Sequence, residues 1–218
     1  MKNPHGLSRR NVLKWGGAAA SVMVAGALLP NFGISAALAA DLGSGDVGVL
    51  NYAYALEQLE AAFYTQVVSS PYSGISDEEL ATLTEIRDHE IAHRDFLKKG
   101  LGKSAIPDLE VNFSKINFKS RASVLGTAEV FENLGVAAYN GAGKLIQKVD
   151  YLAAAGSIVS VEARHAAAIS GMLRGNGASA VGAGHVDAKG LDGALSPKQV
   201  LPKAGPFIKT PVTAMSLV

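Results

Sequence analysis

Two tetrapeptides decide the fold of this chain: Glu90-Ile91-Ala92-His93 and Glu162-Ala163-Arg164-His165. Both have the pattern Glu-x-x-His, and residues three apart on an α-helix lie one above the other on the same face. A carboxylate and an imidazole placed in this way can bind one metal ion from the same side. One such pair alone is more often a solvated surface pair. Two pairs in helical segments predict a site that is closed from opposite walls of a helix bundle.

A second pattern is repeated in the two halves of the chain. Glu57 is followed by six residues and then Tyr64, and Glu132 is followed by six residues and then Tyr139. The Tyr is nearly two helical turns from the Glu, so we expect it to stack on the face of its own Glu. Each half would thus form a helical hairpin, with one Glu from its first helix and Glu-x-x-His from its second.

This inventory of side chains is the one that carboxylate-bridged di-metal centres in helix bundles use. Two divalent ions are expected, with Glu90 and Glu162 bridging them and with water, peroxide or O2 in the remaining positions. The predicted ligands are Glu57, Glu90, His93, Glu132, Glu162 and His165.

Several neighbouring side chains leave alternatives open. Glu60 and Glu129 lie one turn from Glu57 and Glu132 and could replace them as ligands. Tyr64 and Tyr139 are expected in the core with their hydroxyls near the metals, as candidates for a hydrogen-bonding or redox role. The remaining histidines of the predicted bundle and its extension, His89 and His185, are expected to be exposed and unrelated to the metals.

Helical periodicity predicts four long helices, in an all-α fold. They are expected over 46–69, 77–99, 120–143 and 150–174, within a bundle domain of residues 40–177. Residues 101–119 contain Pro107 and an extended-looking alternation, and predict a long crossover connection between the hairpins. Residues 178–218 are rich in Gly, Pro and Ala, and predict a mostly irregular extension over the bundle, with a short helix at 197–201.

The composition of the 218 residues agrees with closely packed helices, because 48% are apolar, only 6% are aromatic and 24 are Gly. The formal net charge of +1 gives no reason to expect nucleic acid as a partner. There are no cysteines, which excludes disulfides, zinc ribbons, iron–sulfur clusters and a cysteine nucleophile.

The N-terminal 39 residues are interpreted as an export signal. Arg9 and Arg10 precede an uncharged run from Trp15 to Leu29, and Ala37-Leu38-Ala39 is a small-x-small cleavage site. The stretch resembles a twin-arginine signal, which predicts export in the folded state by that machinery and a periplasmic or secreted protein. The alternative is a membrane anchor, but the run is shorter than the roughly 20 residues that span a bilayer. No stable span is expected in the mature chain.

Over residues 46–175 the chain resembles the ferritin-like superfamily, and most closely its secreted, desiccation-related type. The resemblance lies in Val161-Glu162-Ala163-Arg164-His165-Ala166 and in residues 135–142, Gly-Val-Ala-Ala-Tyr-Asn-Gly-Ala. It implies a ferritin-like four-helix bundle with an iron or manganese pair and redox chemistry with O2 or peroxide. Ferroxidase, peroxidase and catalase-like activities all fit.

Two other functions remain open at this point. The first is non-catalytic metal binding or storage, and the second is a structural role that protects against stress such as drying. Neither the choice between iron and manganese nor the presence of a homo-oligomer follows from the residues.

Overall fold

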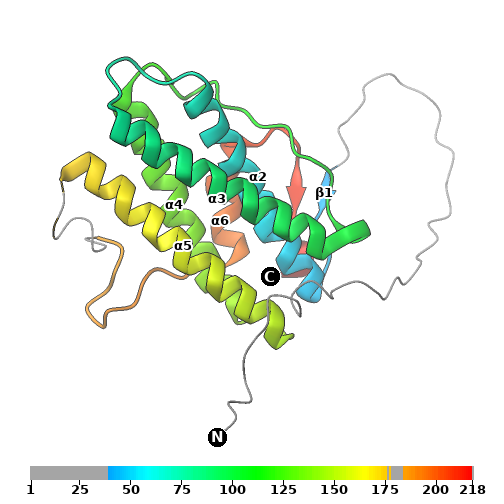
Figure 1. The fold of residues 1–218 in the computed structure, drawn as a ribbon. Coiled ribbons are helices and arrows are strands. Elements are labelled where there is room, and N and C mark those ends of the chain that lie inside the picture. The colour runs from blue at the N-terminus through cyan, green and yellow to red at the C-terminus, as the bar shows by residue number, and fades with distance from the viewer. Residues whose placement is uncertain (1–38, 176, 178–183, 218) are drawn as a thin grey trace, which may run out of the picture.

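Four long helices form the body of the protein: α2 (Gly45–Ser69), α3 (Asp77–Leu101), α4 (Arg121–Gly143) and α5 (Val149–Arg174). The computed structural model describes residues 39–175, 177 and 184–217. Helix α2 packs along α3, and α4 packs along α5, so two hairpins lie side by side (Figure 1). The predicted all-α four-helix bundle is therefore confirmed.

Local sequence signals explain where α3 begins and ends. The Ser76 side chain accepts a hydrogen bond from the backbone N–H of Glu79, and three acidic residues occupy the first turn. Lys98 and Lys99 lie in the last turn, where they complement the helix dipole. Gly102 follows with a φ of 55°, a conformation that glycine adopts without strain.

The first part of the crossover between α3 and α4 is held by polar side chains of α2. It begins with a short 3-10 helix, η1 (Gly102–Ser104), and runs along the bundle to the start of α4 (Figure 1). Asn51 donates to the carbonyls of Leu42 and Ser104 and accepts from the Ile106 N–H. Gln58 accepts from the Leu109 N–H. Helix α2 is consequently buried on almost every side.

Aromatic side chains fill one end of the bundle. The ring of Phe63 on α2 contacts Phe131 on α4 with 5.2 Å between the ring centroids. Phe113 and Phe118 from the crossover pack on the same ring. The apolar residues of the crossover therefore complete the core at this end.

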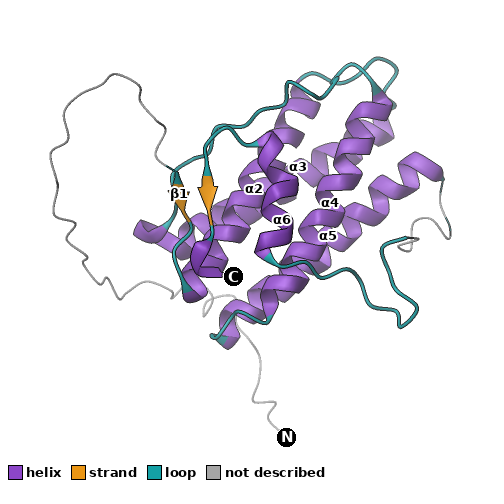
Figure 2. Ribbon diagram, turned by 180° about the vertical axis from the view of Figure 1, so that it is seen from behind, coloured by secondary structure: helices purple, strands orange, loops and turns teal. Residues whose placement is uncertain are grey.

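The C-terminal extension is more regular than predicted. Its helix α6 (Pro197–Ala204) is longer than the expected 197–201 and packs on α4, and 3-10 helices η3 (Gly205–Phe207) and η4 (Met215–Leu217) follow. Strand β2 (Val212–Thr213) pairs in parallel with β1 (Ala40–Asp41) beside α2 (Figure 2). The extension packs closely on α4 at Gly141, where any larger residue would clash, because a Cβ there would lie 1.9 Å from the Leu195 carbonyl oxygen.

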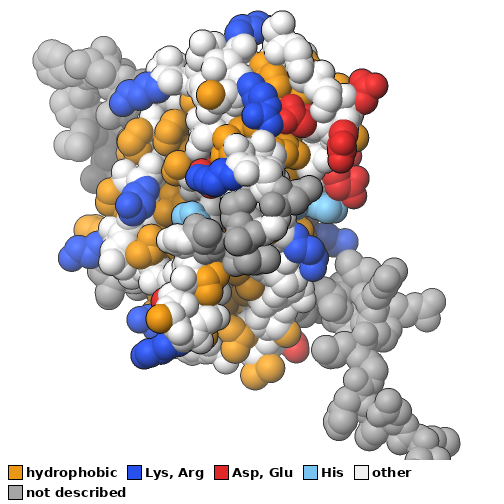
Figure 3. Space-filling view, turned by 90° about the vertical axis from the view of Figure 1, so that its left-hand side faces the viewer, with side chains coloured by type: hydrophobic (Ala, Val, Ile, Leu, Met, Phe, Trp, Pro, Cys, Tyr) orange, Lys and Arg blue, Asp and Glu red, His pale blue; other side chains and the backbone are white. Residues whose placement is uncertain are grey.

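Charged side chains are spread over the surface. Basic groups are scattered across the face in Figure 3, and acidic groups gather near one of its edges. Within the described ranges, no helix has the length and apolar character needed to cross a bilayer. Of the predicted export signal, residues 1–38 lie outside the described part of the chain.

Candidate metal centre

The six predicted ligands lie together in the middle of the bundle, and each of the four long helices supplies at least one of them. Glu57 comes from α2 and Glu132 from α4. The Glu-x-x-His pairs come from α3 and α5, so each pair reaches the centre from its own hairpin. All four carboxylate side chains are fully buried, and the two histidines retain slight exposure, 12% of the His93 side chain and 5% of that of His165.

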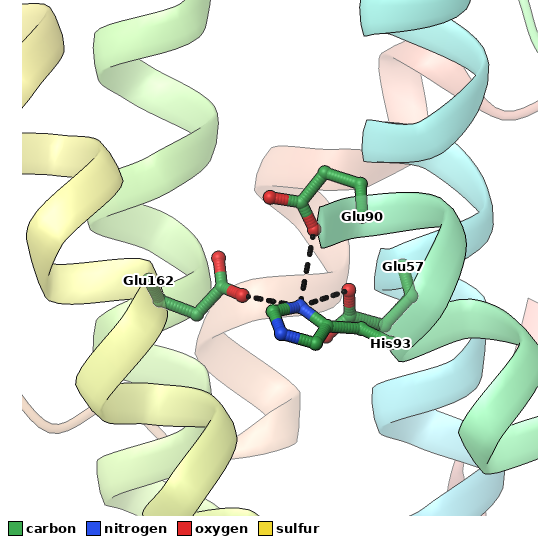
Figure 4. Close-up of side chains that lie close together, drawn as sticks. All are labelled: Glu57, Glu90, His93 and Glu162. Atoms are coloured by element: carbon green, nitrogen blue, oxygen red, sulfur yellow. Dashed lines mark ion pairs between the residues drawn. The ribbon is translucent and has the colours of Figure 1, made fainter. Parts of the chain in front are cut away.

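Their nitrogen and oxygen atoms form two sets of four. In the first set, His93 Nδ1 lies 2.9 Å from Glu162 Oε1 and 3.5 Å from both Glu57 Oε2 and Glu90 Oε2 (Figure 4). The ligand atoms of this set all lie within 4.8 Å of one another.

In the second set, His165 Nδ1 lies 2.8 Å from Glu90 Oε1 and 3.4 Å from Glu132 Oε2. Glu162 Oε2 completes it at 3.9 Å from the same nitrogen, and these ligand atoms are also within 4.8 Å of one another. Glu90 and Glu162 belong to both sets, each with one oxygen in either. This is the arrangement that two bridging carboxylates require.

The atoms of both sets lack ordinary partners. Although they lie within ion-pair distance of one another, none makes a hydrogen bond of acceptable geometry to any described residue. Buried polar atoms without hydrogen bonds are costly, so each such atom calls for an explanation. Eight oxygen and nitrogen atoms in two tetrads, from carboxylates and imidazoles, suit two divalent ions of the iron and manganese type.

Glu57 and Glu132 each have one carboxylate oxygen outside the two sets, and a tyrosine hydroxyl donates a hydrogen bond to it. Tyr139 on α4 donates to Glu57 Oε1 on α2 at 2.5 Å, and Tyr64 on α2 donates to Glu132 Oε1 on α4. Each hydroxyl thus binds the Glu of the opposite helix, whereas the repeat predicted that each Tyr stacks on its own Glu. These two hydrogen bonds connect α2 of the first hairpin with α4 of the second beside the site.

Burial and crowding of like charges dominate the electrostatics. Burial raises the pKa of Glu90 to about 7, although His165 and His93 pull it down. Burial and the charge of Glu90 raise the pKa of Glu162 well above its usual value.

The imidazoles respond in the opposite sense. Burial lowers the pKa of His93, but the carboxylates of Glu162, Glu57 and Glu90 outweigh burial and raise that pKa to about 12. The pKa of His165 rises to about 10, because Glu132 and Glu90 outweigh its burial. Without metal, the site would hold protons in place of cations.

His89 keeps 42% of its side chain exposed, as expected, but the expectation that it is unrelated to the site is wrong. His89 Nδ1 lies 3.0 Å from His165 Nε2, and the two rings are nearly parallel with centroids 5.2 Å apart. With His165 Nδ1 facing the second set, its Nε2–H is free to donate to His89. Such a bond fixes the tautomer and the orientation of a metal-binding imidazole. His185 is exposed, as expected.

The two alternative carboxylate ligands have different environments. Glu129 forms an ion pair with Arg174 and lies outside both sets. Glu60 also lies outside both sets, but it is only 4% exposed. Burial raises its pKa well above the usual value, and the charges of Glu90, Glu162, Glu132 and Glu57 add to the shift.

Gly135 provides the space that the Glu60 side chain occupies. A Cβ at Gly135 would lie 3.3 Å from Glu60 Oε1 and 3.6 Å from Glu162 Oε2. Glu60 therefore brings a fifth buried carboxyl close to the second set.

Comparison with known families places these residues in context. A family model described as a ferritin-like domain matches residues 45–175, which contain all four bundle helices and every predicted ligand. A comparison with curated protein sequences finds no match.

Proposed function

Because the chain belongs to the family of ferritin-like domains, we propose that its bundle binds two iron or manganese ions and uses them in redox chemistry with O2 or peroxide. The observation that supports this most directly is the pair of tetrads that share Glu90 and Glu162. Two ions bound there supply paired one-electron chemistry and open positions for an oxidant.

The protein groups have distinct tasks in this proposal. Glu57 and Glu132 would bind one ion each, and the hydroxyls of Tyr139 and Tyr64 fix the remaining oxygen of each carboxylate. Four ionised carboxylates offset the four positive charges of two divalent ions. Complete burial of these carboxylates excludes water, which strengthens the electrostatic interactions inside the site.

Proton transfer is assigned to the carboxyl of Glu60. Burial and the neighbouring carboxylates raise its pKa, which favours the neutral form, and both it and Glu162 Oε2 lie against Gly135, although Glu60 belongs to neither tetrad. A neutral carboxylic acid can donate a hydrogen bond or a proton to a reduced oxygen species in the site. We therefore assign to Glu60 the role of a proton donor that is not a ligand.

Export is the second part of the proposal. We propose that residues 1–39 direct the folded, metal-loaded protein through the twin-arginine machinery to the periplasm or the exterior, as in the secreted, desiccation-related type. The support is Arg9-Arg10 ahead of an uncharged apolar run. Replacing both by Lys should leave full-length precursor in the cytoplasm, as read by fractionation and mass spectrometry. Normal export of that variant would contradict the proposal.

The metal and the reaction are tested on protein purified from its native compartment. Elemental analysis should find about two iron or manganese ions per chain. The loaded protein should consume O2 in the presence of Fe(II), or consume peroxide, faster than the same amount of free metal. A Glu162→Ala/His165→Ala protein should lose both properties, and Glu129→Ala is the control outside the site.

The outcomes separate the proposed function from the two alternatives. Many ions per chain in a large cage would indicate storage, which light scattering detects together with the metal analysis. A ligand-deleted variant that fully protects cells against drying would indicate a structural role. Either result would contradict the redox proposal.

A further inference from the structure

A small apolar cavity begins about one helical turn from the ligands of the metal centre. Its volume, measured as the space open to the centre of a water-sized molecule, is about 20 Å³. About 10–15 Å³ on this measure accommodates one water molecule, so the cavity has room for a single small molecule. Aliphatic and aromatic side chains from all four bundle helices form its wall.

The position of the cavity follows from the helix positions of its lining residues. Ala53 precedes Glu57 by one turn on α2, Leu97 follows His93 by one turn on α3, and Ile158 precedes Glu162 by one turn on α5. One helical turn advances about 5.4 Å. The cavity is therefore the next layer of the bundle below the ligands.

Tyr139 forms the boundary between the cavity and the ligands. Its ring lines the cavity, and its hydroxyl donates to Glu57 Oε1 at 2.5 Å. The opposite side of the ligand layer differs, because the Phe63–Phe131 contact and the crossover rings pack that end. The cavity thus lies on the side of the ligand layer away from these aromatic rings.

The polarity of the wall distinguishes between candidate occupants. The Tyr52 hydroxyl is buried in this wall and makes no hydrogen bond to a described residue. Hydrogen peroxide has two O–H donors and several lone pairs, and most of them would be unpaired here. Dioxygen has no donors and only weak acceptors, so it loses little on leaving water for an apolar cavity.

From these observations we propose that the cavity is a binding site for molecular oxygen that supplies the metal centre, and that O2 rather than peroxide is the oxidant the protein selects. The inference rests on the proposed redox function. Reduction of O2 to hydrogen peroxide takes two electrons and two protons, and two Fe(II) ions held by the six ligands would supply the electrons and become Fe(III). With peroxide as oxidant, the same two electrons and two protons give two water molecules.

Two alanines on α2 provide a matched pair of variants. Ala53 lines the cavity one turn before Glu57, and Ala61 lies one turn after Glu57, outside the cavity lining. Both side chains are buried. Ala53→Val adds two methyl-sized groups to the cavity, whereas Ala61→Val adds the same volume to a closely packed layer. Ala53→Val should consequently be the less destabilised of the two in thermal melts.

Oxygen binding is measured directly with O2 gas as the probe. The full chain is loaded with zinc, which is diamagnetic and redox-inert, and methyl NMR spectra are recorded under O2 and under N2. Paramagnetic broadening should be strongest at Leu56 and Ile158, which line the cavity, and weak at Leu83 and Ile169. Ala53→Val should remove the extra paramagnetic broadening at the cavity methyls, and Ala61→Val should retain that broadening.

Reactivity is measured on the Fe(II)-loaded proteins by anaerobic mixing with O2 or with peroxide. The Ala53→Val protein should react several-fold more slowly with O2 and at an unchanged rate with peroxide. The Ala61→Val protein should keep the original ratio of the two rates. Equal slowing of both reactions, an unchanged O2 rate, or uniform broadening of all four methyls would overturn the oxygen site while leaving the redox function standing. Iron that reacts with neither oxidant in the unaltered protein would overturn both.

Discussion

Removing the metal ions should destabilise the protein strongly, because the centre brings four buried carboxylates together. Glu57, Glu90, Glu132 and Glu162 are fully buried, and their atoms in the two tetrads have no hydrogen-bond partner among the described residues. In the metal-free protein, some of these carboxyls must take up protons or repel one another. The burial that raises the pKa of Glu90 to about 7 is one expression of this cost.

The size of the effect follows from binding linkage. An ion present at 100 times its dissociation constant stabilises the folded state by about 2.7 kcal/mol. Two such ions would contribute about 5 kcal/mol, a large part of the roughly 5–15 kcal/mol that stabilises a typical domain. For a chain of this length, about 1 kcal/mol shifts the melting temperature by roughly 2–4 °C, so chelation should lower it by about 10–20 °C.

Calorimetry on loaded and chelated protein at pH 8 measures the shift. Glu162→Gln keeps the shape of the side chain but removes a bridging charge. This variant should melt higher than the unaltered protein when both are metal-free, and should gain little from metal. Glu129→Gln alters a carboxylate outside the tetrads and should keep the full shift. Equal melting temperatures for loaded and chelated protein would refute the di-metal assignment.

Three further predictions concern protons and the surroundings of the ligands. Metal-free protein should lose stability from about pH 4.5 to 7 as Glu90 ionises, because its folded pKa of about 7 lies above the ordinary value of 4.5 and the folded state holds the extra proton. Because the folded pKa values of His93 and His165 are also raised, the loss of stability continues above pH 6.5. Urea unfolding at stepped pH measures this loss, and a rise in stability over the same range would contradict the reasoning. His89→Ala should weaken metal binding by about 10–100-fold and His89→Asn should restore part of it, as read by competition with a chromophoric chelator, and His185→Ala should change nothing. Gly135→Ala should displace the Glu60 carboxyl and slow the proton-coupled reaction, whereas Gly126→Ala, where a Cβ meets nothing within 4 Å, should leave the rate intact.

The sequence was sufficient to predict the fold and to bring six side chains to one point. Helical spacing determines which residues share a face, and the Glu-x-x-His pairs at matching places in two hairpins left few alternative arrangements. The long crossover was also predictable, because 101–119 combine a proline with an extended alternation. The structure places Glu90 and Glu162 in both tetrads, as bridging requires.

Contacts between helices could not be predicted in the same way. Seven residues rise about 10 Å along a helix, so Tyr64 is far along α2 from Glu57, and its hydroxyl reaches Glu132 across the bundle instead. His89 is adjacent to Glu90 in sequence and thus points about 100° away from it around α3. Only the placement of α5 brings His165 to it. The pairing of β1 with β2 joins two-residue strands at opposite ends of the described chain, and no local pattern indicates it.

The repeat also shows where the two halves of the site differ. The position that corresponds to Glu60 in the second half is Gly135, and the position that corresponds to His89 is Val161. The glycine leaves room for the carboxyl that its counterpart supplies, since two long side chains could not both occupy that space. Glu60 and Glu162 Oε2 both lie against Gly135, and His89 contacts His165, so both extra groups are near the second tetrad. A centre with symmetric ligands thus has asymmetric surroundings, and the ion held by His165 should differ from its neighbour in affinity and in access to protons.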